Sequence, residues 1–464
     1  MNYLLKLWKK ERSFILLIGG FLVVAFLAQP HPALAMWAGF LFAGYAAIAN
    51  DSIQTIGTFI ASNQDKKWWV LWLFLGGIFV ATACYSFFGS DTADNKVLVA
   101  LEDKEVADTL ELLLKSGEED GTRAVPDSEL GPHLEKLDDH LEGLVLEARK
   151  DPEKTKLGHI LDWKYRFEGV DKEEWVTDGR DGDVSHGRLL SKGFERTPTE
   201  IHFLQIAAPI ILLILTRMRM PVSTTFILLT SFASSPAAVG KVLAKSFSGY
   251  LLAFLVAVLC YLVVSKISKK MFKGKAHFGW TIAQWVTSGT LWSVWLMQDM
   301  ANIAVFLPRS LNSYEFLGFT GFIFLGLGIL MYVKGGRIQT IVLEKSNVED
   351  VRFATVIDFI YAILLFYFKL HSKVPMSTTW VFLGLLAGRE LMMSLTKTGK
   401  NSVGRAFAIS ARDFGFAMIG LGISIAIAIG VNDQLSFSLM LENLPSEFAN
   451  GFSKFFSKLP SWGG

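Results

Sequence analysis

The sequence predicts an all-α, multi-pass membrane protein made of two inverted repeats with broken helices and re-entrant hairpins, plus a small, mainly helical soluble insert. Three observations lead to this fold class: apolar runs of bilayer length recur, a short polar motif occurs twice, and one acidic stretch interrupts the apolar pattern. Hydrophobic residues make up 51% of the 464 residues. Mean hydropathy is +0.38, so the chain is not a soluble globule.

Nine apolar runs have about the length of a membrane span. A membrane-spanning helix needs roughly 17 to 25 predominantly apolar residues. Runs of about this length lie at 13–29, 33–50, 68–88, 201–216, 246–265, 278–297, 315–333, 353–370 and 413–430. The basic N-terminus and first run share features with a secretory signal, but a second run follows directly, so we expect an uncleaved first helix. Cys84 and Cys260 both lie inside apolar runs, which gives neither a disulfide framework nor a thiolate metal site.

Residues 91–200 form the predicted acidic insert. They hold 29 acidic and 16 basic residues, whereas the rest of the chain holds 14 acidic and 29 basic residues. Leucines at helical spacing within 106–114 and 134–148 predict helices in a soluble module. We expect the module to tether two membrane parts, with a regulatory or partner-binding role as the alternative. Replacing residues 95–195 with a flexible linker is therefore expected to leave the membrane function in place.

A repeated motif divides the membrane part into two halves. Residues 220–225 read Met-Pro-Val-Ser-Thr-Thr and residues 374–379 read Val-Pro-Met-Ser-Thr-Thr. Upstream of each copy an acidic residue lies inside a membrane run, Asp51 in the first half and Asp299 in the second. The distance from the acid to the serine of the motif is 172 positions in the first half and 78 in the second. The difference is close to the length of the insert, so the halves match once the insert is set aside.

The repeat and the insert together give the predicted domain boundaries. They are residues 1–90 for the first part of repeat 1 with an extra N-terminal helix, 91–200 for the insert, 201–275 for the second part of repeat 1, 276–432 for repeat 2, and 433–464 for an amphipathic C-terminal tail.

The two acidic residues are the candidate cation ligands. An ionised carboxylate at bilayer depth costs about 2.5 to 3.5 kcal/mol on insertion scales, so it persists where a cation, a partner or a water-lined cavity offsets that cost. Asn50 beside Asp51, and Gln298 beside Asp299, supply the neutral oxygens that sodium prefers. Sodium is the only metal predicted, at Asp51 and Asp299. A proton stays the alternative, because the sequence does not set the pKa of a buried Asp.

The two Ser-Thr-Thr segments predict an oxyanion site. Proline favours the first turn of a helix and Ser or Thr caps it, so each segment starts a helix whose free N–H groups and hydroxyls can bind an anion. The predicted substrate ligands are Ser223, Thr224, Thr225, Ser377, Thr378, Thr379, Gln54 and Asn302. No pair of basic residues lies at matched positions deep in the spans. We therefore expect an anion held by hydroxyls and amides rather than by Arg or Lys.

Two further polar residues occupy nearly matched positions. Asp358 lies 17 positions before Pro375, and Gln205 lies 16 positions before Pro221. We assign them a coupling or gating role, with a helix–helix hydrogen bond as the alternative. The sequence shows no nucleophile triad, no metal-ligand cluster and no phosphate-binding glycine loop. It therefore predicts no enzymatic activity and no cofactor.

At these motifs the sequence resembles the inorganic phosphate transporter (PiT) family of cation-coupled anion symporters. The pattern of that family is Gly-Ala-Asn-Asp-x-x-Asn in each half, followed downstream by Pro-Val-Ser-Thr-Thr-His. Here residues 48–54 read Ile-Ala-Asn-Asp-Ser-Ile-Gln and residues 297–302 read Met-Gln-Asp-Met-Ala-Asn. The chain departs from the pattern at both leading glycines, at two asparagines that are glutamines here, and at the histidines, which are Phe226 and Trp380.

The resemblance implies a secondary active transporter that couples sodium or protons to the symport of inorganic phosphate across the cell membrane. Asp51 and Asp299 would hold the cations, and the Ser-Thr-Thr segments would hold phosphate between two re-entrant hairpins. A permease for sulfate or another oxyanion is the first alternative, and a non-transporting receptor that signals through the insert is the second. The expected partners are phosphate, the cation and the lipid bilayer, with no nucleic acid; homodimer formation and the side that the insert faces are left open.

Overall fold

The computed structural model describes most of the membrane part and scattered residues of the insert. The described stretches are 2–88, 201–218, 222–233, 236–271, 274–308, 311–333, 350–371, 376–398 and 401–432, with single residues and short segments elsewhere. Their regular structure is helical, without a β-strand in these stretches. The chain divides into two compact units. The first comprises 1–83, 184–309 and 314–464, and the second comprises 84–183 and 310–313.

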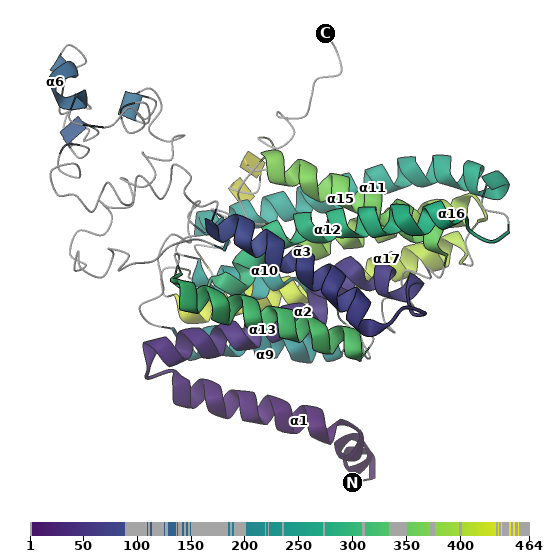
Figure 1. The fold of residues 1–464 in the computed structure, drawn as a ribbon. Coiled ribbons are helices and arrows are strands. Elements are labelled where there is room, and N and C mark those ends of the chain that lie inside the picture. The colour runs from purple at the N-terminus through teal and green to yellow at the C-terminus, as the bar shows by residue number, and fades with distance from the viewer. Residues whose placement is uncertain are drawn as a thin grey trace. The chain divides into compact units, whose positions relative to one another are not determined.

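Helices of the first unit cover all the predicted apolar runs. Those up to residue 271 are α1 (Asn2–Ala28), α2 (Pro32–Ser62), α3 (Trp68–Phe88), α9 (Phe203–Arg217), α10 (Thr224–Ile227), the 3₁₀-helix η3 (Leu229–Phe232) and α11 (Pro236–Met271). Those after it are α12 (Phe278–Ala304), α13 (Ser313–Tyr332), α15 (Val351–His371), α16 (Thr378–Leu395) and α17 (Val403–Val431). The long helices run roughly alongside one another in one bundle, with α1 at its edge (Figure 1).

Seven of the described helices are long and apolar enough to cross a membrane. Their spanning segments are Glu11–Ala28, Pro32–Asp51, Trp68–Phe88, Val242–Ser265, Ser313–Tyr332, Val351–Phe368 and Val403–Val431. Large apolar side chains on these helices face outward, such as Leu325 and Ile329, which are 61% and 66% exposed. A hydrocarbon environment accommodates such a surface. The fold is therefore that of a helical, multi-pass membrane protein.

Helix pairing repeats in the two halves. The helix that carries the first acid, α2, packs against α9, which precedes the first Ser-Thr-Thr segment. In the same way α12, which carries the second acid, packs against α15, which precedes the second segment. Contacts between α2 and α12 join the halves. The chain therefore brings each acid next to the helix that leads into its motif.

Close packing of α16 on α11 depends on two glycines. Gly384 and Gly388 are one helical turn apart, and a Cβ atom at either would overlap a backbone carbonyl group of α11, at Tyr250 or Phe254. Small residues spaced in this way let two membrane helices approach closely. This contact anchors the second motif, because α16 begins directly after Ser377.

The two motifs open helices of different lengths. After the first motif α10 spans four residues, and then the chain continues through η3 into α11. After the second motif α16 runs for 18 residues without a break. The sequence predicts a broken helix in each half. The structure has one after the first motif, whereas the helix after the second motif is continuous.

The second unit has a small core of its own. Leu113, Val125, Leu134 and Val145 are buried there, and Arg149 donates hydrogen bonds to the carbonyl oxygens of Leu113 and Val125. The short helix α6 (Gly131–Leu134) belongs to this unit. The boundary between the units lies at residue 183, so the described residues of 184–189 group with the membrane unit although the predicted insert extends to residue 200.

Candidate functional site

Each Ser-Thr-Thr segment caps a helix through its serine. The Ser223 hydroxyl oxygen accepts a hydrogen bond from the Phe226 amide at 3.2 Å, and the Ser377 hydroxyl oxygen accepts one from the Trp380 amide at 3.2 Å. Both serines are N-caps in extended backbone conformation. Because the oxygens serve as acceptors, the hydroxyl protons stay available to donate to a third group. The helix dipole contributes mainly at α16, since α10 is only four residues long.

In the first half, Asp51 is bonded to the motif. The Thr224 hydroxyl donates a hydrogen bond to the Asp51 carboxylate. The Asn50 side chain donates to Asp51 Oδ1 at 2.6 Å and to the carbonyl oxygen of Val222 at 3.0 Å. These bonds fix the acid of α2 to Val222 and Thr224, at the start of α10.

In the second half, Asp299 has matching partners. The Asn302 side chain donates to Asp299 Oδ1 at 2.6 Å, and the Thr378 hydroxyl interacts with the same carboxylate. The Tyr361 hydroxyl donates to the carbonyl oxygen of Thr378 at 2.9 Å, which holds the first turn of α16 against α15. Thr224 and Thr378 follow the capping serines, so the same position of each motif contacts the acid of its own half.

Asn302 joins the two halves into one buried network. Its Nδ2 atom lies 3.3 Å from the Thr224 hydroxyl and 3.1 Å from the Thr225 hydroxyl. The Thr225 hydroxyl donates in turn to the carbonyl oxygen of Met376, just before the second motif, at 3.2 Å. Asp51 and Asp299 are also close enough to repel each other electrostatically. The two acids and the two motifs therefore form one site rather than two.

Unpaired polar atoms accumulate at this site. Among the described residues, Gln298 Oε1, Asp299 Oδ2 and Asn302 Oδ1 are buried acceptors that no hydrogen bond of normal geometry reaches, and Trp380 Nε1 is a buried donor without an acceptor. Leaving such an atom unpaired in a protein interior costs about 1–3 kcal/mol, more for a charged group. Orphan acceptors around a carboxylate are suited to a cation, and an orphan donor is suited to an anion.

The aromatic residues that directly follow the two Ser-Thr-Thr segments pack against each other. The rings of Phe226 and Trp380 lie edge to face with centroids 5.3 Å apart. Both side chains are 1% exposed. The two motifs thus meet through the positions at which this chain departs from the PiT pattern.

The remaining predicted site residues take different places. Gln298 donates from Nε2 to the carbonyl oxygen of Leu365 at 2.8 Å, which ties α12 to α15. Thr379 is buried in the first turn of α16. The side chain of Gln54 lies outside the described residues. Gln205 caps α9, accepting from the His202 amide at 2.7 Å, and its own amide reaches the Ser231 carbonyl at 3.0 Å.

Asp358 is the centre of a second buried cluster. It accepts hydrogen bonds from the Thr58 hydroxyl at 2.6 Å and from the Ser288 hydroxyl at 2.5 Å, and so joins α15 to both acidic helices. One turn along those helices, Asn63 donates to Gln284 at 3.1 Å. The polar face of α2 thus continues from Asp51 past Thr55 and Thr58 to the end of the helix.

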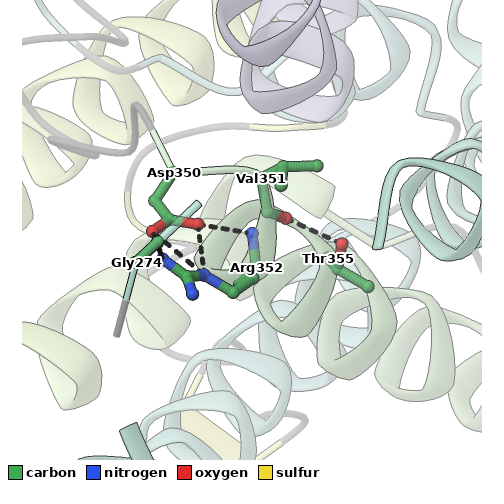
Figure 2. Close-up of polar contacts among 5 residues, drawn as sticks. All are labelled: Gly274, Asp350, Val351, Arg352 and Thr355. Atoms are coloured by element: carbon green, nitrogen blue, oxygen red, sulfur yellow. Dashed lines mark hydrogen bonds and ion pairs between the residues drawn. The ribbon is translucent and has the colours of Figure 1, made fainter. Parts of the chain in front are cut away.

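This polar face leads to a hollow of about 520 Å³ at the end of α2. Its lining includes Ser62, Asn63, Lys66, Lys275 and Arg352. Figure 2 shows how Arg352 is held at the start of α15.

Both Asp350 oxygens accept from the Arg352 side chain, and the Gly274 carbonyl lies 3.3 Å from its Nη2 atom. The Arg352 side chain holds the pKa of Asp350 below its usual value.

Two buried basic residues near the site do not follow from the sequence motifs. Arg188 is 2% exposed and Lys245 is 8% exposed. Lys245 could be noticed as a lysine at the start of an apolar run, whereas Arg188 lies in the acidic stretch, where the sequence offers no signal for it.

Comparison of the chain with protein-family models, with curated proteins and with solved structures finds no match. The likeness to the PiT family therefore rests on the motifs alone.

Proposed function

We propose that this chain is a secondary active transporter that couples a cation, sodium or a proton, to the symport of an inorganic oxyanion, with phosphate as the first candidate. Asp51 and Asp299 bind the cations, with Asn50 and Gln298 as neighbouring oxygen ligands. The Ser-Thr-Thr segments bind the anion. The chain works in the cell membrane, with its two halves related as inverted repeats.

The observation that carries this proposal is the buried network through Asn302. It connects Asp51, Thr224 and Asp299 across the two halves by hydrogen bonds. A movement of the first motif would therefore alter the hydrogen bonds of both acids. Two buried acceptors of this network, Asp299 Oδ2 and Asn302 Oδ1, have no hydrogen-bond partner. Unpaired acceptors beside a carboxylate suit a bound cation, and the Ser-Thr-Thr hydroxyls beside them can donate to an anion.

Electrostatics supports coupling between the two ions. Asp51 and Asp299 repel each other in a buried site. A cation bound at one carboxylate reduces this repulsion and so lowers the energetic cost of keeping the other carboxylate ionised. A bound cation also offsets the negative charge that an oxyanion would bring to the two carboxylates. Each ion therefore makes binding of the other more favourable, which is the condition for symport.

The hydroxyl protons link the two kinds of site. In this conformation Thr224 donates to Asp51, and Thr225 donates to the Met376 carbonyl. A cation on Asp51 would compete for the carboxylate and release the Thr224 proton toward an anion. Asp358 and the polar face of α2 provide a route for the cation from the hollow to Asp51.

Reconstituted uptake tests the proposal. Purified protein in proteoliposomes should accumulate radiolabelled phosphate when a sodium or proton gradient is imposed. Unlabelled phosphate, sulfate and chloride are the competitors, and a sulfate permease would show stronger competition by sulfate. The second candidate is a receptor, because residues 84–183 belong to a compact unit of their own that could bind a signalling partner. A receptor would show no uptake of any oxyanion under either gradient.

A further inference from the structure

A short buried segment that follows the insert carries a positive charge into the membrane unit. Its described residues are Val184, Ser185, Arg188 and Leu189, and all four are buried. A turn holds Arg188, because its amide donates a hydrogen bond to the carbonyl oxygen of Ser185 at 3.2 Å. The first compact unit includes this segment, whereas residues 84–183 belong to the second. Arg188 is therefore part of the membrane unit although it lies in the acidic stretch of the sequence.

The guanidinium group of Arg188 lies near the acid of the second half. Its Nε atom donates a hydrogen bond to the carbonyl oxygen of Met297 at 2.8 Å. Met297 lies on α12 two positions before Asp299, and the guanidinium group and the Asp299 carboxylate attract each other electrostatically. Burial lowers the pKa of Arg188 to about 10 and the charge of Asp299 opposes the shift, so Arg188 stays protonated at neutral pH. The chain itself thus supplies Asp299 with a cation.

The acid of the first half has different surroundings. Among the described residues, the Asp51 carboxylate accepts from the neutral side chains of Asn50 and Thr224, and the charged group that acts on it is the carboxylate of Asp299. Lys245 of α11 lies within electrostatic range of Arg188, but burial favours its uncharged amine. The two acids of the site are therefore unequal, because the fixed positive charge acts on Asp299.

We propose that Arg188 is the resident cation of Asp299, so that the chain binds one mobile cation, at Asp51, together with each oxyanion. The guanidinium charge takes the part of a second bound cation, since it offsets both the repulsion between the two carboxylates and the negative charge of the anion. This inference rests on the proposed function and replaces a mobile cation at each acid with one mobile and one fixed cation. It also makes residues 184–189 part of the transport site.

The sodium dependence of phosphate binding tests the inference. Radiolabelled phosphate is bound to the full-length purified chain over a range of sodium concentrations, with choline keeping the ionic strength constant. The wild type should respond to sodium with a Hill coefficient of about 1, because one mobile cation binds with the anion. Arg188→Gln keeps a hydrogen-bond donor for the Met297 carbonyl oxygen but loses the charge. A second sodium ion should then be needed, so the Hill coefficient should rise toward about 2.

The size of the loss should itself depend on sodium. At low sodium, Arg188→Gln should bind phosphate at least about tenfold more weakly than the wild type, and high sodium should restore most of the loss. A disturbed fold would instead weaken binding at every sodium concentration. Arg188→Lys retains the charge and should keep the sodium dependence of the wild type. The control, Arg412→Gln, removes a positive charge from a side chain that is 57% exposed and should bind as the wild type does.

Equal sodium midpoints and Hill coefficients in the wild type and Arg188→Gln would overturn the inference, and so would a wild-type Hill coefficient of about 2. A wild-type chain that binds neither phosphate nor sulfate would overturn it too. If Arg188→Gln does not fold, two acid variants decide. Asp51→Asn should then abolish the sodium dependence and Asp299→Asn should retain part of it, whereas equal losses would overturn the inference. The proposed function fails differently, when wild-type proteoliposomes accumulate no oxyanion under either gradient although phosphate binding depends on sodium.

Discussion

Replacing Thr224 with valine tests the link between the cation and anion sites. The Thr224 side chain is 1% exposed, donates to the Asp51 carboxylate and lies 3.3 Å from Asn302 Nδ2. Valine has nearly the same shape, so the substitution removes the hydroxyl and leaves the packing in place. A hydrogen bond to a charged group contributes about 1.5–3 kcal/mol. At about 1.4 kcal/mol per tenfold, phosphate affinity should fall by roughly 10- to 100-fold, because the released Thr224 hydroxyl can no longer donate to the anion.

The assay is phosphate binding at several sodium concentrations, with Thr230→Val as the matched control. Thr230 is equally buried, but its hydroxyl donates to the Phe226 carbonyl within its own turn. Thr224→Val should weaken phosphate binding and reduce its dependence on sodium, whereas Thr230→Val should change neither. Equal losses in the two variants would assign the effect to local structure, and unchanged binding in Thr224→Val would refute the link.

Three further predictions follow from the same geometry. Asp51→Ala and Asp299→Ala should each lower uptake and weaken its cation dependence, as measured in proteoliposomes; full cation dependence in both would refute their role. Replacing residues 95–180 with a Gly/Ser linker should preserve phosphate binding. The longer replacement of 95–195, first expected to be harmless, should reduce it, because it also removes Arg188, which donates to the Met297 carbonyl oxygen beside Asp299; loss of binding with the shorter replacement would contradict this. Asp350→Asn should lower stability by about 0.5–1 kcal/mol at neutral pH, since the Asp350–Arg352 pair is partly exposed. The pKa of Asp350 is lowered in the folded chain, so the difference from wild type should shrink as pH falls through that lowered pKa; a difference independent of pH would exclude the ion pair as its source.

The membrane helices could be predicted from the sequence because hydrocarbon imposes a length and a composition on each span. Every predicted apolar run coincides with a helix. The capping serines also follow from local chemistry, since Pro and Ser favour a helix start wherever they occur. Polar residues of α12, such as Asp299 and Asn302, could be recognised because their burial cost requires a partner.

The tertiary part of the site could not be predicted in this way. Nothing local to Asn302 indicates that it lies beside Thr224 and Thr225, because that contact depends on how α12 packs against the first motif. Arg188 is a clearer case, since its neighbours in the sequence are those of a solvated acidic module while its neighbours in space are Met297 and Asp299. Only long-range packing reveals a charge of this kind.

Accumulation of radiolabelled phosphate in proteoliposomes, with and without an imposed sodium gradient, tests the central claim most directly. A parallel series under a proton gradient separates the two cations, and an ionophore that collapses each gradient serves as the control. Coupled symport predicts that internal phosphate rises above the external concentration only while one gradient is present, and that Asp51→Ala reduces this excess. Phosphate that only equilibrates across the membrane, at the same rate with and without either gradient, would contradict coupled transport.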